Sequence, residues 1–278
     1  MPTRGLAGKV VVITGASSGF GRGTALALAR KRAKLVLAAR RGELIDDLAQ
    51  ECRAEGGQAF AYAIDVSLER EVEALARNAL RGCGRIDVWI NNAGVGALGP
   101  FERIPLDDHV QVIRTNLLGT FYGSYFAYQH FLERGEGTLI NIASELGRHT
   151  VPYSTSYTAA KQGVVGLSDA LRQEIELKKL EDVHVCTVMP TAHDTPFFDH
   201  AAHYTGHRIE APKPLHDPQE VVEAIVGLVL DPRDKQIVGS DGIAKVLLKR
   251  LAPGVAASLA ARQVETGVSA GRGQEPEP

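Results

Sequence analysis

The sequence predicts an α/β domain built around a mostly parallel sheet, and three observations carry this prediction. Short runs rich in β-branched residues alternate with longer stretches of helical periodicity. The short runs are almost continuously apolar, as in strands that are buried on both faces. No internal repeat and no linker rich in Pro, Gly or Ser divides the chain before about residue 265. We therefore expect one doubly wound domain of the Rossmann type over residues 1–265, with helices on both faces of the sheet.

Each predicted strand is an apolar, β-branched run bounded by turn or helix residues. The first, KVVVIT, is followed by a glycine-rich turn and by a helical stretch from Arg22 to about Arg32. Strands that alternate with helical segments in this way form a mainly parallel sheet. The seven strands are expected at Lys9–Thr14, Lys34–Ala39, Gln58–Ile64, Ile86–Asn91, Gly137–Ala143, Val183–Met189 and Gln236–Gly239.

The composition is that of a globular protein and excludes one class of partner. The chain has 278 residues, of which 44% are hydrophobic and 23% charged, and its formal net charge is -2. This balance gives no field that would attract nucleic acid or an anionic membrane, so any anion has to be bound by a local cluster. We expect no nucleic-acid partner.

The N-terminal apolar run and the cysteines predict a cytoplasmic location. The run Val10–Ile13 is far shorter than the ~20 residues of a spanning helix, and the small-residue cleavage site of a secretory signal is absent. Cys52, Cys83 and Cys186 are odd in number and show no CxxC pattern. Buried or idle thiols in a reducing compartment are the favoured interpretation.

A glycine-rich turn, Thr14–Gly21 (TGASSGFG), joins the first strand to the first helix. Glycines here allow a tight turn and let the backbone approach a pyrophosphate, which then rests on the helix N-terminus. The spacing is G-x3-G-x-G rather than the general G-x-G-x-x-G. A merely tight turn is the alternative, but it leaves three glycines at this place unexplained. The residues predicted to bind a dinucleotide here are Gly15, Ser17, Ser18, Gly19, Phe20 and Gly21.

The end of the second strand predicts NADP(H) rather than NAD(H). An NAD site usually has Asp or Glu about 20 residues past the glycines, where the carboxylate binds the ribose hydroxyls. Here Ala39 is followed by Arg40 and Arg41. A carboxylate would repel a 2′-phosphate, whereas an arginine binds one through paired, charge-assisted hydrogen bonds. We predict that Arg40 makes this contact, assisted by Arg41 or Ser17; two solvated arginines at a strand end are the alternative.

Three motifs occur in an order and at intervals that are typical of one family. They are TGASSGFG, then Asn91-Asn92-Ala93-Gly94, then Ser144 followed thirteen residues later by Tyr157-Thr158-Ala159-Ala160-Lys161. On these motifs the chain from about Gly8 to Gly239 resembles the short-chain dehydrogenase/reductase (SDR) family. The resemblance implies an oxidoreductase that acts on CH–OH groups and assembles as a homodimer or homotetramer.

The resemblance also implies further contacts to the cofactor. Asp65 and Val66, after the third strand, match the pair that contacts the adenine ring. Asn92, Ala93 and Gly94, after the fourth strand, match residues that line the cofactor cleft and support the sheet.

Four residues match the family's catalytic set: Asn116, Ser144, Tyr157 and Lys161. A tyrosine hydroxyl can protonate the alkoxide that carbonyl reduction leaves, but its pKa of ~10 makes it a poor base for the reverse reaction. Lys161 lies one helical turn after Tyr157, and a cation there is expected to lower the pKa of the tyrosine. Ser144 would stabilise the substrate oxygen. By resemblance, Lys161 holds the nicotinamide ribose and Asn116 completes a proton relay.

A helix face of ordinary surface residues is the alternative for Tyr157 and Lys161. The residues that follow form the apolar stripe of an amphipathic helix. That alternative explains the stripe and leaves the pair at the start of the helix unexplained.

The segment after the sixth strand departs from the family pattern at one position. Pro190–Thr195 (PTAHDT) resembles the family's Pro-Gly…Thr segment over the nicotinamide, and the resemblance gives Pro190 and Thr195 contacts to the cofactor. Thr191 stands where the family usually has glycine, at a place where glycine often marks a backbone φ that threonine disfavours.

Residues 190–217 are expected to form a lid over the substrate. Two interpretations of its aromatic residues stay open: they line an apolar pocket, or they pack the lid onto the body of the domain. These residues are Phe197, Phe198 and Tyr204.

Histidines are concentrated in the same segment without predicting a metal. The spacing of His200, His203 and His207 would place them on one helix face. There is no HExxH and no adjacent carboxylate set. Solvated or packed histidines are favoured, and no metal is expected.

Residues 242–265 are expected to form a helical extension, and 266–278 a disordered tail. The extension mixes apolar residues with Lys245, Lys249 and Arg250. Such a segment could lie on a membrane surface, cap the substrate pocket or pack on a partner subunit. Pro253 interrupts it and its apolar stretches are short, so membrane attachment through 242–263 is disfavoured.

Three hypotheses of function follow. The first is an NADP(H)-dependent reductase or dehydrogenase of a small-molecule carbonyl or secondary alcohol. The second is a non-catalytic NADP(H)-binding sensor or scaffold, and the third is a membrane-peripheral reductase of a lipid or steroid. The presence of all four catalytic residues favours catalysis over sensing.

Overall fold

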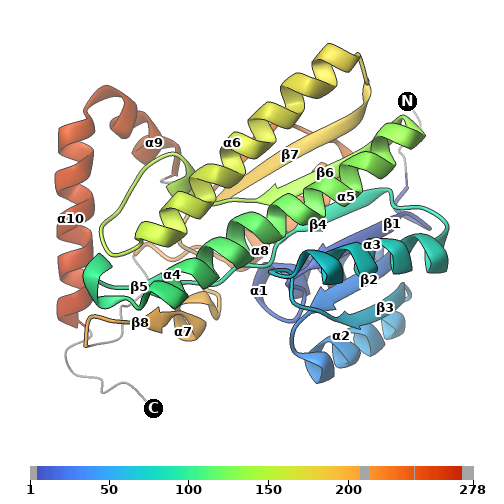
Figure 1. The fold of residues 1–278 in the computed structure, drawn as a ribbon, viewed down its shortest axis with the longest axis horizontal. Helices are drawn as coiled ribbons and strands as arrows, with labels where there is room; N and C mark the ends of the chain where they lie inside the picture. The colour runs from blue at the N-terminus through green and yellow to red at the C-terminus, as the bar shows by residue number, and fades with distance from the viewer. Residues whose placement is uncertain (1–4, 207–212, 241, 271–278) are drawn as a thin grey trace.

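A seven-stranded sheet, parallel at every strand pair, lies at the centre of the domain (Figure 1). The computed structural model describes residues 5–206, 213–240 and 242–270. The strand order is β3-β2-β1-β4-β6-β7-β9, which confirms the predicted doubly wound, Rossmann-type fold. The strands are β1 (Val10–Thr14), β2 (Lys34–Ala39), β3 (Gln58–Ala63), β4 (Val88–Asn91), β6 (Glu136–Ile142), β7 (Asp182–Pro190) and β9 (Lys235–Val238).

Alternation along each strand sends side chains to both faces, and each face is covered by helices. On β1, Val11 and Ile13 join one core cluster, whereas Val10 and Val12 join the other. The first cluster contains α1 (Gly19–Arg30), α2 (Gly42–Ala54) and α8 (Pro218–Leu230). The second contains α3 (Glu69–Cys83), α5 (Gly119–Arg134) and α6 (Thr155–Lys178), which cross the front of the sheet in Figure 1.

A reversal of chain direction across the sheet places the site. From β1 the chain runs outward through β2 to β3, and then returns to β4 on the other side of β1. The chain therefore leaves β1 and β4 toward opposite sides of the sheet, and ligands bind at the carboxyl edge beside such a reversal.

Short elements at this edge were not expected from the sequence. One is a two-stranded parallel sheet of β5 (Ala97–Leu98) and β8 (Ala202–His203). It was not predicted because strands of two residues are too short to show periodicity. The others are η1 (Phe101–Arg103), α4 (Leu106–Ile113), a π-helical turn (Arg114–Leu118), η3 (Glu145–Gly147) and α7 (Phe197–His200).

The expected helix face of histidines is wrong. Helix α7 ends at His200, and His203 lies in β8, where pairing with β5 replaces helical structure. His207 lies outside the described residues. Within the described ranges, no group of three or more His, Cys, Asp or Glu side chains is arranged to hold a metal ion.

The C-terminal extension forms two helices, α9 (Gly242–Leu251) and α10 (Pro253–Ala270). Pro253 begins α10, where its missing N–H costs no helical hydrogen bond. The helix continues past residue 265 to Ala270, so the predicted disordered tail is wrong for 266–270; residues 271–278 lie outside the described part. None of the helices in that part combines the length and apolarity needed to cross a bilayer.

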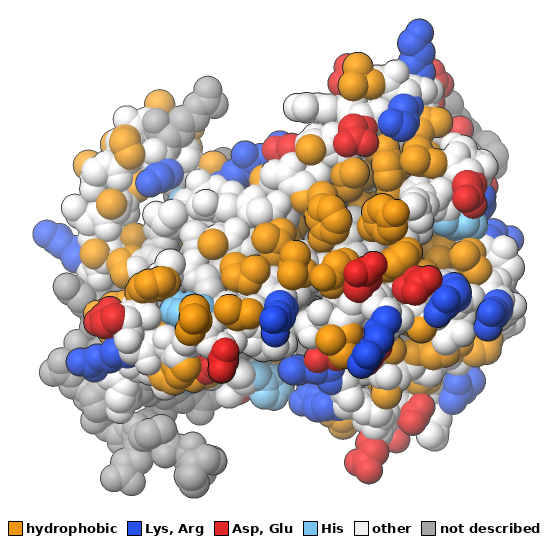
Figure 2. Space-filling model, in the orientation of Figure 1, with side chains coloured by type: hydrophobic (Ala, Val, Ile, Leu, Met, Phe, Trp, Pro, Cys, Tyr) orange, Lys and Arg blue, Asp and Glu red, His pale blue; other side chains and the backbone are white. Residues whose placement is uncertain are grey.

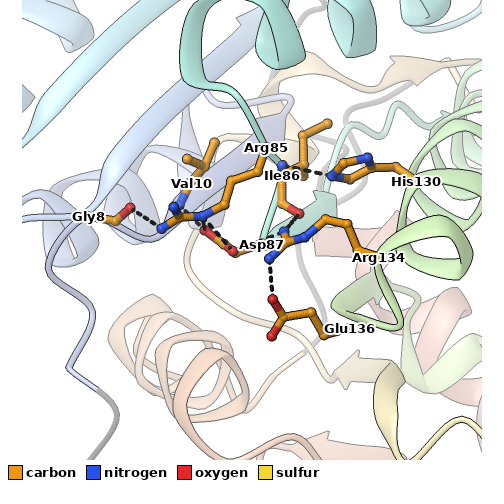
Figure 3. A network of polar contacts seen from close by, with 8 residues as sticks. All are labelled: Gly8, Val10, Arg85, Ile86, Asp87, His130, Arg134 and Glu136. Carbon is orange, nitrogen blue, oxygen red and sulfur yellow. Dashed lines mark hydrogen bonds and ion pairs between the residues drawn. The ribbon is translucent and has the colours of Figure 1, made fainter.

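Asp87 ties the amino edge of the sheet together (Figure 3). Its carboxylate accepts hydrogen bonds from Val10 N at 2.8 Å, from Arg85 Nε at 2.9 Å and from Arg134 Nη1 at 3.1 Å. Burial alone would raise the pKa of Asp87, but these three donors outweigh it and lower the pKa. The contacts hold β1 and the start of β4 to the end of α5.

The substitution Asp87→Asn should destabilise the fold in a pH-dependent way. A carboxyl group whose folded pKa is depressed stabilises the protein above its unfolded pKa of ~3.9, and this stabilisation is lost as pH falls through the folded pKa. We expect a loss of about 2 kcal/mol in the free energy of unfolding at pH 7, measured by urea denaturation. The difference from wild type should shrink below about pH 4. An equal difference at all pH values would contradict the role given to the charge.

Candidate active site

A cavity of about 1080 Å³ opens at the carboxyl edge of the sheet, between the loops after β1, β4, β6 and β7. It brings together most of the residues that the sequence singled out. Those that line it are Gly15, Ser17, Ser18, Gly19, Phe20, Arg40, Arg41, Asp65, Val66, Asn92, Ala93, Gly94, Ser144, Tyr157, Lys161, Pro190 and Thr195. The cavity does not reach Gly21 or Asn116, which lie in its supporting wall.

The glycine-rich turn is shaped by close backbone packing. Gly15 has φ +64°, and a Cβ there would lie 2.5 Å from the Cα of Ala93. A Cβ on Gly21 would lie 2.5 Å from Nδ2 of Asn92. Asn92 Nδ2 donates to the carbonyls of Thr14 (3.1 Å) and Gly15 (2.9 Å), which fastens the two loops together. Any residue larger than glycine would clash at positions 15 and 21. With glycine at both, the start of α1 stays open to the cavity.

Two arginines lie at the cavity rim after β2. Arg40 and Arg41 are both exposed, and Arg41 Nη2 donates to Ser17 Oγ at 3.2 Å. The residue before them is Ala39, so the end of β2 carries cations and no carboxylate.

The turn after β3 lines the cavity with Asp65 and Val66. Asp65 Oδ1 accepts from Ser67 N at 2.9 Å, and Asp65 N donates to Glu71 Oε2 at 2.6 Å. Val66 is buried against Gly119, where a Cβ would come within 2.9 Å of the valine side chain. These contacts fix the turn that lines the cavity.

Ser144, Tyr157 and Lys161 lie together in the cavity. Tyr157 and Lys161 lie one turn apart at the start of α6, and Lys161 Nζ is 5.6 Å from the centre of the Tyr157 ring. Lys161 is 4% exposed and its Nζ donates to the carbonyl of Ile142 at 2.8 Å. Ser144, just past β6, interacts with the Tyr157 hydroxyl, and its Oγ also accepts from Leu146 N at 3.2 Å.

Burial dominates the electrostatics of this pair. Burial raises the pKa of Tyr157 to about 12, against a smaller lowering by the hydrogen bond with Ser144. Burial also lowers the pKa of Lys161 to about 8. The expected lowering of the tyrosine pKa by Lys161 is therefore wrong for the protein without ligand, since desolvation outweighs the nearby cation.

Asn116 lies in the π-helical turn, behind the cavity wall. Its side chain binds the backbone of Val95 in both directions: Nδ2 donates to the carbonyl at 2.9 Å, and Oδ1 accepts from the N–H at 2.8 Å. Gly94 separates it from the lysine, because a Cβ on Gly94 would lie 3.6 Å from Asn116 Oδ1 and 3.8 Å from Lys161 Nζ. Asn116 thus positions the loop after β4 that carries Gly94 and Val95.

Thr191 occupies its place without backbone strain. It is not among the described residues with positive φ, so threonine in place of the family's glycine does not force a disfavoured backbone conformation. Its side chain fills the space beside two glycines: a Cβ would come within 2.9 Å of Thr191 Cβ if built on Gly239, and within 2.6 Å of its Cγ2 if built on Gly242.

The lid aromatics divide between the two interpretations. Phe197 and Phe198 line the cavity, and the Phe197 ring centre lies 5.2 Å from that of Tyr157. Tyr204 instead packs on the body, where its hydroxyl donates to Asp108 of α4.

The cavity residues that were not predicted individually include Glu145, His149 and Lys245. The sequence marked Lys245 only as part of the extension, and the predicted catalytic and cofactor-binding residues include neither Glu145 nor His149. Their ion pairs join residues up to 100 positions apart, which leaves no local pattern to detect.

The described residues fit a nicotinamide adenine dinucleotide. The glycine turn leaves the N-terminus of α1 open to a pyrophosphate. Arg40, Arg41 and the buried Lys161 line the same cavity and supply cations to it. The fit rests on the donor groups of the lining: the start of α1 after the glycine turn, the two arginines and Lys161.

Comparisons with known proteins agree with the geometry. A family model described as short chain dehydrogenase matches residues 9–204. The chain is 34% identical over 247 residues to the uncharacterized oxidoreductase YxnA of Bacillus subtilis, covering 88% of this chain and 69% of that protein.

Two solved structures are similar over most of their length. One is a short chain dehydrogenase/reductase from Burkholderia phymatum in complex with NAD (TM-score 0.80, 25% identity, 91% of this chain and 96% of that one). The other is an alcohol dehydrogenase from Thermococcus sibiricus complexed with 5-hydroxy-NADP (TM-score 0.72, 28% identity, 82% of this chain and 95% of that one).

The substitution Lys161→Met should change how stability depends on pH. The folded pKa of Lys161, about 8, lies below the unfolded value of ~10.4, so the folded protein holds fewer protons between these values. Wild-type protein should therefore gain about 2 kcal/mol relative to Lys161→Met as pH rises from about 8 to 10. Urea unfolding of both proteins across this range measures the difference. Parallel curves would show that the lysine is not desolvated.

Proposed function

This chain belongs to the short-chain dehydrogenase family, and we propose that it transfers a hydride between NADP(H) and a carbonyl compound or the matching secondary alcohol. The observation that carries the proposal is the convergence of Ser144, Tyr157 and Lys161 in the same cavity as the glycine cradle. Oxidoreductase chemistry is common to the family; the cofactor, the substrate type and the residue roles are the parts proposed here.

Tyr157 serves as the general acid in the reducing direction. When bound, the reduced nicotinamide supplies the hydride. A raised pKa keeps the Tyr157 hydroxyl protonated at neutral pH, ready to donate to the substrate oxygen. Ser144 donates a second hydrogen bond to that oxygen and stabilises its developing charge.

Lys161 stabilises the phenolate that Tyr157 leaves behind. At pH 7 the lysine, with a pKa of about 8, is mainly protonated. A buried cation near the ring offsets part of the desolvation of the phenolate, and so allows the reverse, alcohol-oxidising direction. Asn116 keeps the loop with Gly94 beside Lys161, and we assign to this region the water that returns a proton from solvent.

Arg40 selects NADP(H), assisted by Arg41 and Ser17. Both NAD and a modified NADP occur in the similar solved structures, so family membership alone leaves the choice open. The absence of a carboxylate at Ala39 and the two cations after it support the phosphate form.

The oligomeric state and location are also proposed. A homodimer or homotetramer is supported by an apolar surface on α5 and the end of the π-helical turn before it, visible in Figure 2, where Leu118, Phe121 and Tyr125 are exposed. A cytoplasmic location is supported by the cysteines, all three of which are free thiols.

The substitution Tyr157→Phe should abolish turnover while leaving cofactor binding intact. NADPH absorbance is followed over a panel of ketones, aldehydes and quinones, and binding is measured by NADPH fluorescence. We expect the rate to fall by about 10²–10⁴-fold, the usual contribution of a general acid. Tyr125→Phe, on the exposed face of α5, is the control. Unchanged turnover in Tyr157→Phe would remove the proposed acid, and NADPH binding without turnover in wild type would favour a sensor or scaffold.

The substitution Arg40→Ala should reduce the preference for NADPH over NADH. Loss of a charge-assisted contact worth about 1.5–3 kcal/mol corresponds to roughly 10–100-fold in kcat/KM for NADPH. The value for NADH should stay within about twofold, because no 2′-phosphate is present. Arg30→Ala, whose arginine pairs with Glu55 away from the cavity, is the matched control. Faster use of NADH by wild type would contradict the role of Arg40.

A further inference from the structure

A buried carboxylate lies directly beside the proposed catalytic serine. Glu145 is 6% exposed and lines the cavity. Its Oε1 is 3.1 Å from Lys245 Nζ, and its Oε2 is 3.3 Å from His149 Nε2. The three titratable side chains form a cluster in the cavity, and none of them belongs to the predicted catalytic or cofactor-binding residues.

The lysine of this cluster comes from the C-terminal extension. Lys245 lies in α9, and the other principal contacts of that helix are with α10 and β9. The start of α9 packs closely on the segment after β7, since a Cβ on Gly242 would lie 2.6 Å from Thr191 Cγ2. One turn later, the ion pair with Glu145 brings the helix against the catalytic loop. The extension is thus fixed at two points on the cavity wall.

The environment of this pair distinguishes it from the surface ion pairs. The side chains of Glu145 and Lys245 are 8% and 28% exposed, against 32% and 37% for the pair Asp169–Lys235. Surface pairs contribute about 0–1 kcal/mol, whereas removal of one partner of a buried pair leaves a charge without compensation. Loss of Lys245 would leave Glu145 with His149 alone.

We propose that Lys245 and Glu145 form a latch that holds α9 as a wall of the substrate pocket, and that Lys245 is a positioning residue that determines which substrates fit. The extension then contributes to the cavity lining through Lys245. The proposal rests on the proposed function only for what the pocket binds; the latch itself is a property of the folded chain.

The latch is tested by hydrogen–deuterium exchange of the full-length protein, which requires no substrate. Lys245→Met keeps the apolar stem and removes the charge. We expect the backbone amides of α9 to exchange about tenfold faster or more in this variant, because the ion pair that holds α9 against Glu145 is lost. Lys249→Met is the matched control, on the same helix one turn further and outside the cavity lining. Exchange in β1 and β4 should not change in either variant, which shows that the fold is intact.

The partner residue and a conservative variant complete the test. Glu145→Gln should also speed α9 exchange, and the increase in the double variant should be smaller than the product of the two single increases, because all three variants lose the same ion pair. Lys245→Arg should restore slow exchange. If α9 in Lys245→Met exchanges like wild type and Lys249→Met, the latch is overturned.

Kinetics then test the effect on substrate selection. With the best ketone of the panel and a bulkier homologue, Lys245→Met should change KM for the two compounds unequally, by about tenfold in their ratio, with kcat kept within about threefold. Equal KM ratios in wild type and variant would overturn the positioning role. Failure of the proposed function is distinguishable, because wild-type protein would then not oxidise NADPH while the exchange result still decides the latch.

Discussion

The close approach of two loops at the carboxyl ends of β1 and β4 is the constraint on which the site depends. The Gly15 backbone lies so near Ala93 that a Cβ would be 2.5 Å from its Cα, and Asn92 fastens the two loops through hydrogen bonds to the carbonyls of Thr14 and Gly15. These strands flank the point where strand order reverses, so their contact sets the floor of the cavity. This contact positions the N-terminus of α1 and the loop that carries Gly94. The arginines after β2 lie at the rim of the same cavity.

The burial of Lys161 that the proposed chemistry uses lowers the stability of the folded protein. A lysine that is 4% exposed, with its pKa lowered to about 8, costs free energy in the folded state. The hydrogen bond to the Ile142 carbonyl offsets part of that cost. The same desolvation raises the pKa of Tyr157, which suits the tyrosine to donating a proton and makes it depend on the lysine when it must accept one. Strained electrostatics of this kind are characteristic of functional sites.

Much of the fold and of the cavity could be predicted because the relevant signals are local. Strand composition and the glycine spacing gave the sheet and the cradle, and the four-residue interval of Tyr157 and Lys161 placed both side chains in one cavity. Contacts distant in sequence could not be read in this way: Glu145 meets Lys245 across 100 residues, and β5 pairs with β8 through two residues each. The four-residue spacing from Lys161 led us to expect a lowered pKa for Tyr157. This was wrong because the spacing does not show how deeply the tyrosine is buried. The helical start of the expected tail was missed because small, polar residues carry little periodicity.

Transfer of deuterium tests the central claim most directly. The protein is incubated with NADPH deuterated at the transferable C4 position and with the panel carbonyl compound that oxidises NADPH fastest, and the alcohol is analysed by mass spectrometry. We expect one deuterium on the carbinol carbon of the product, with the hydroxyl proton supplied through Tyr157. Deuterium that stays on the nicotinamide or appears in water, with none in the product, would contradict it.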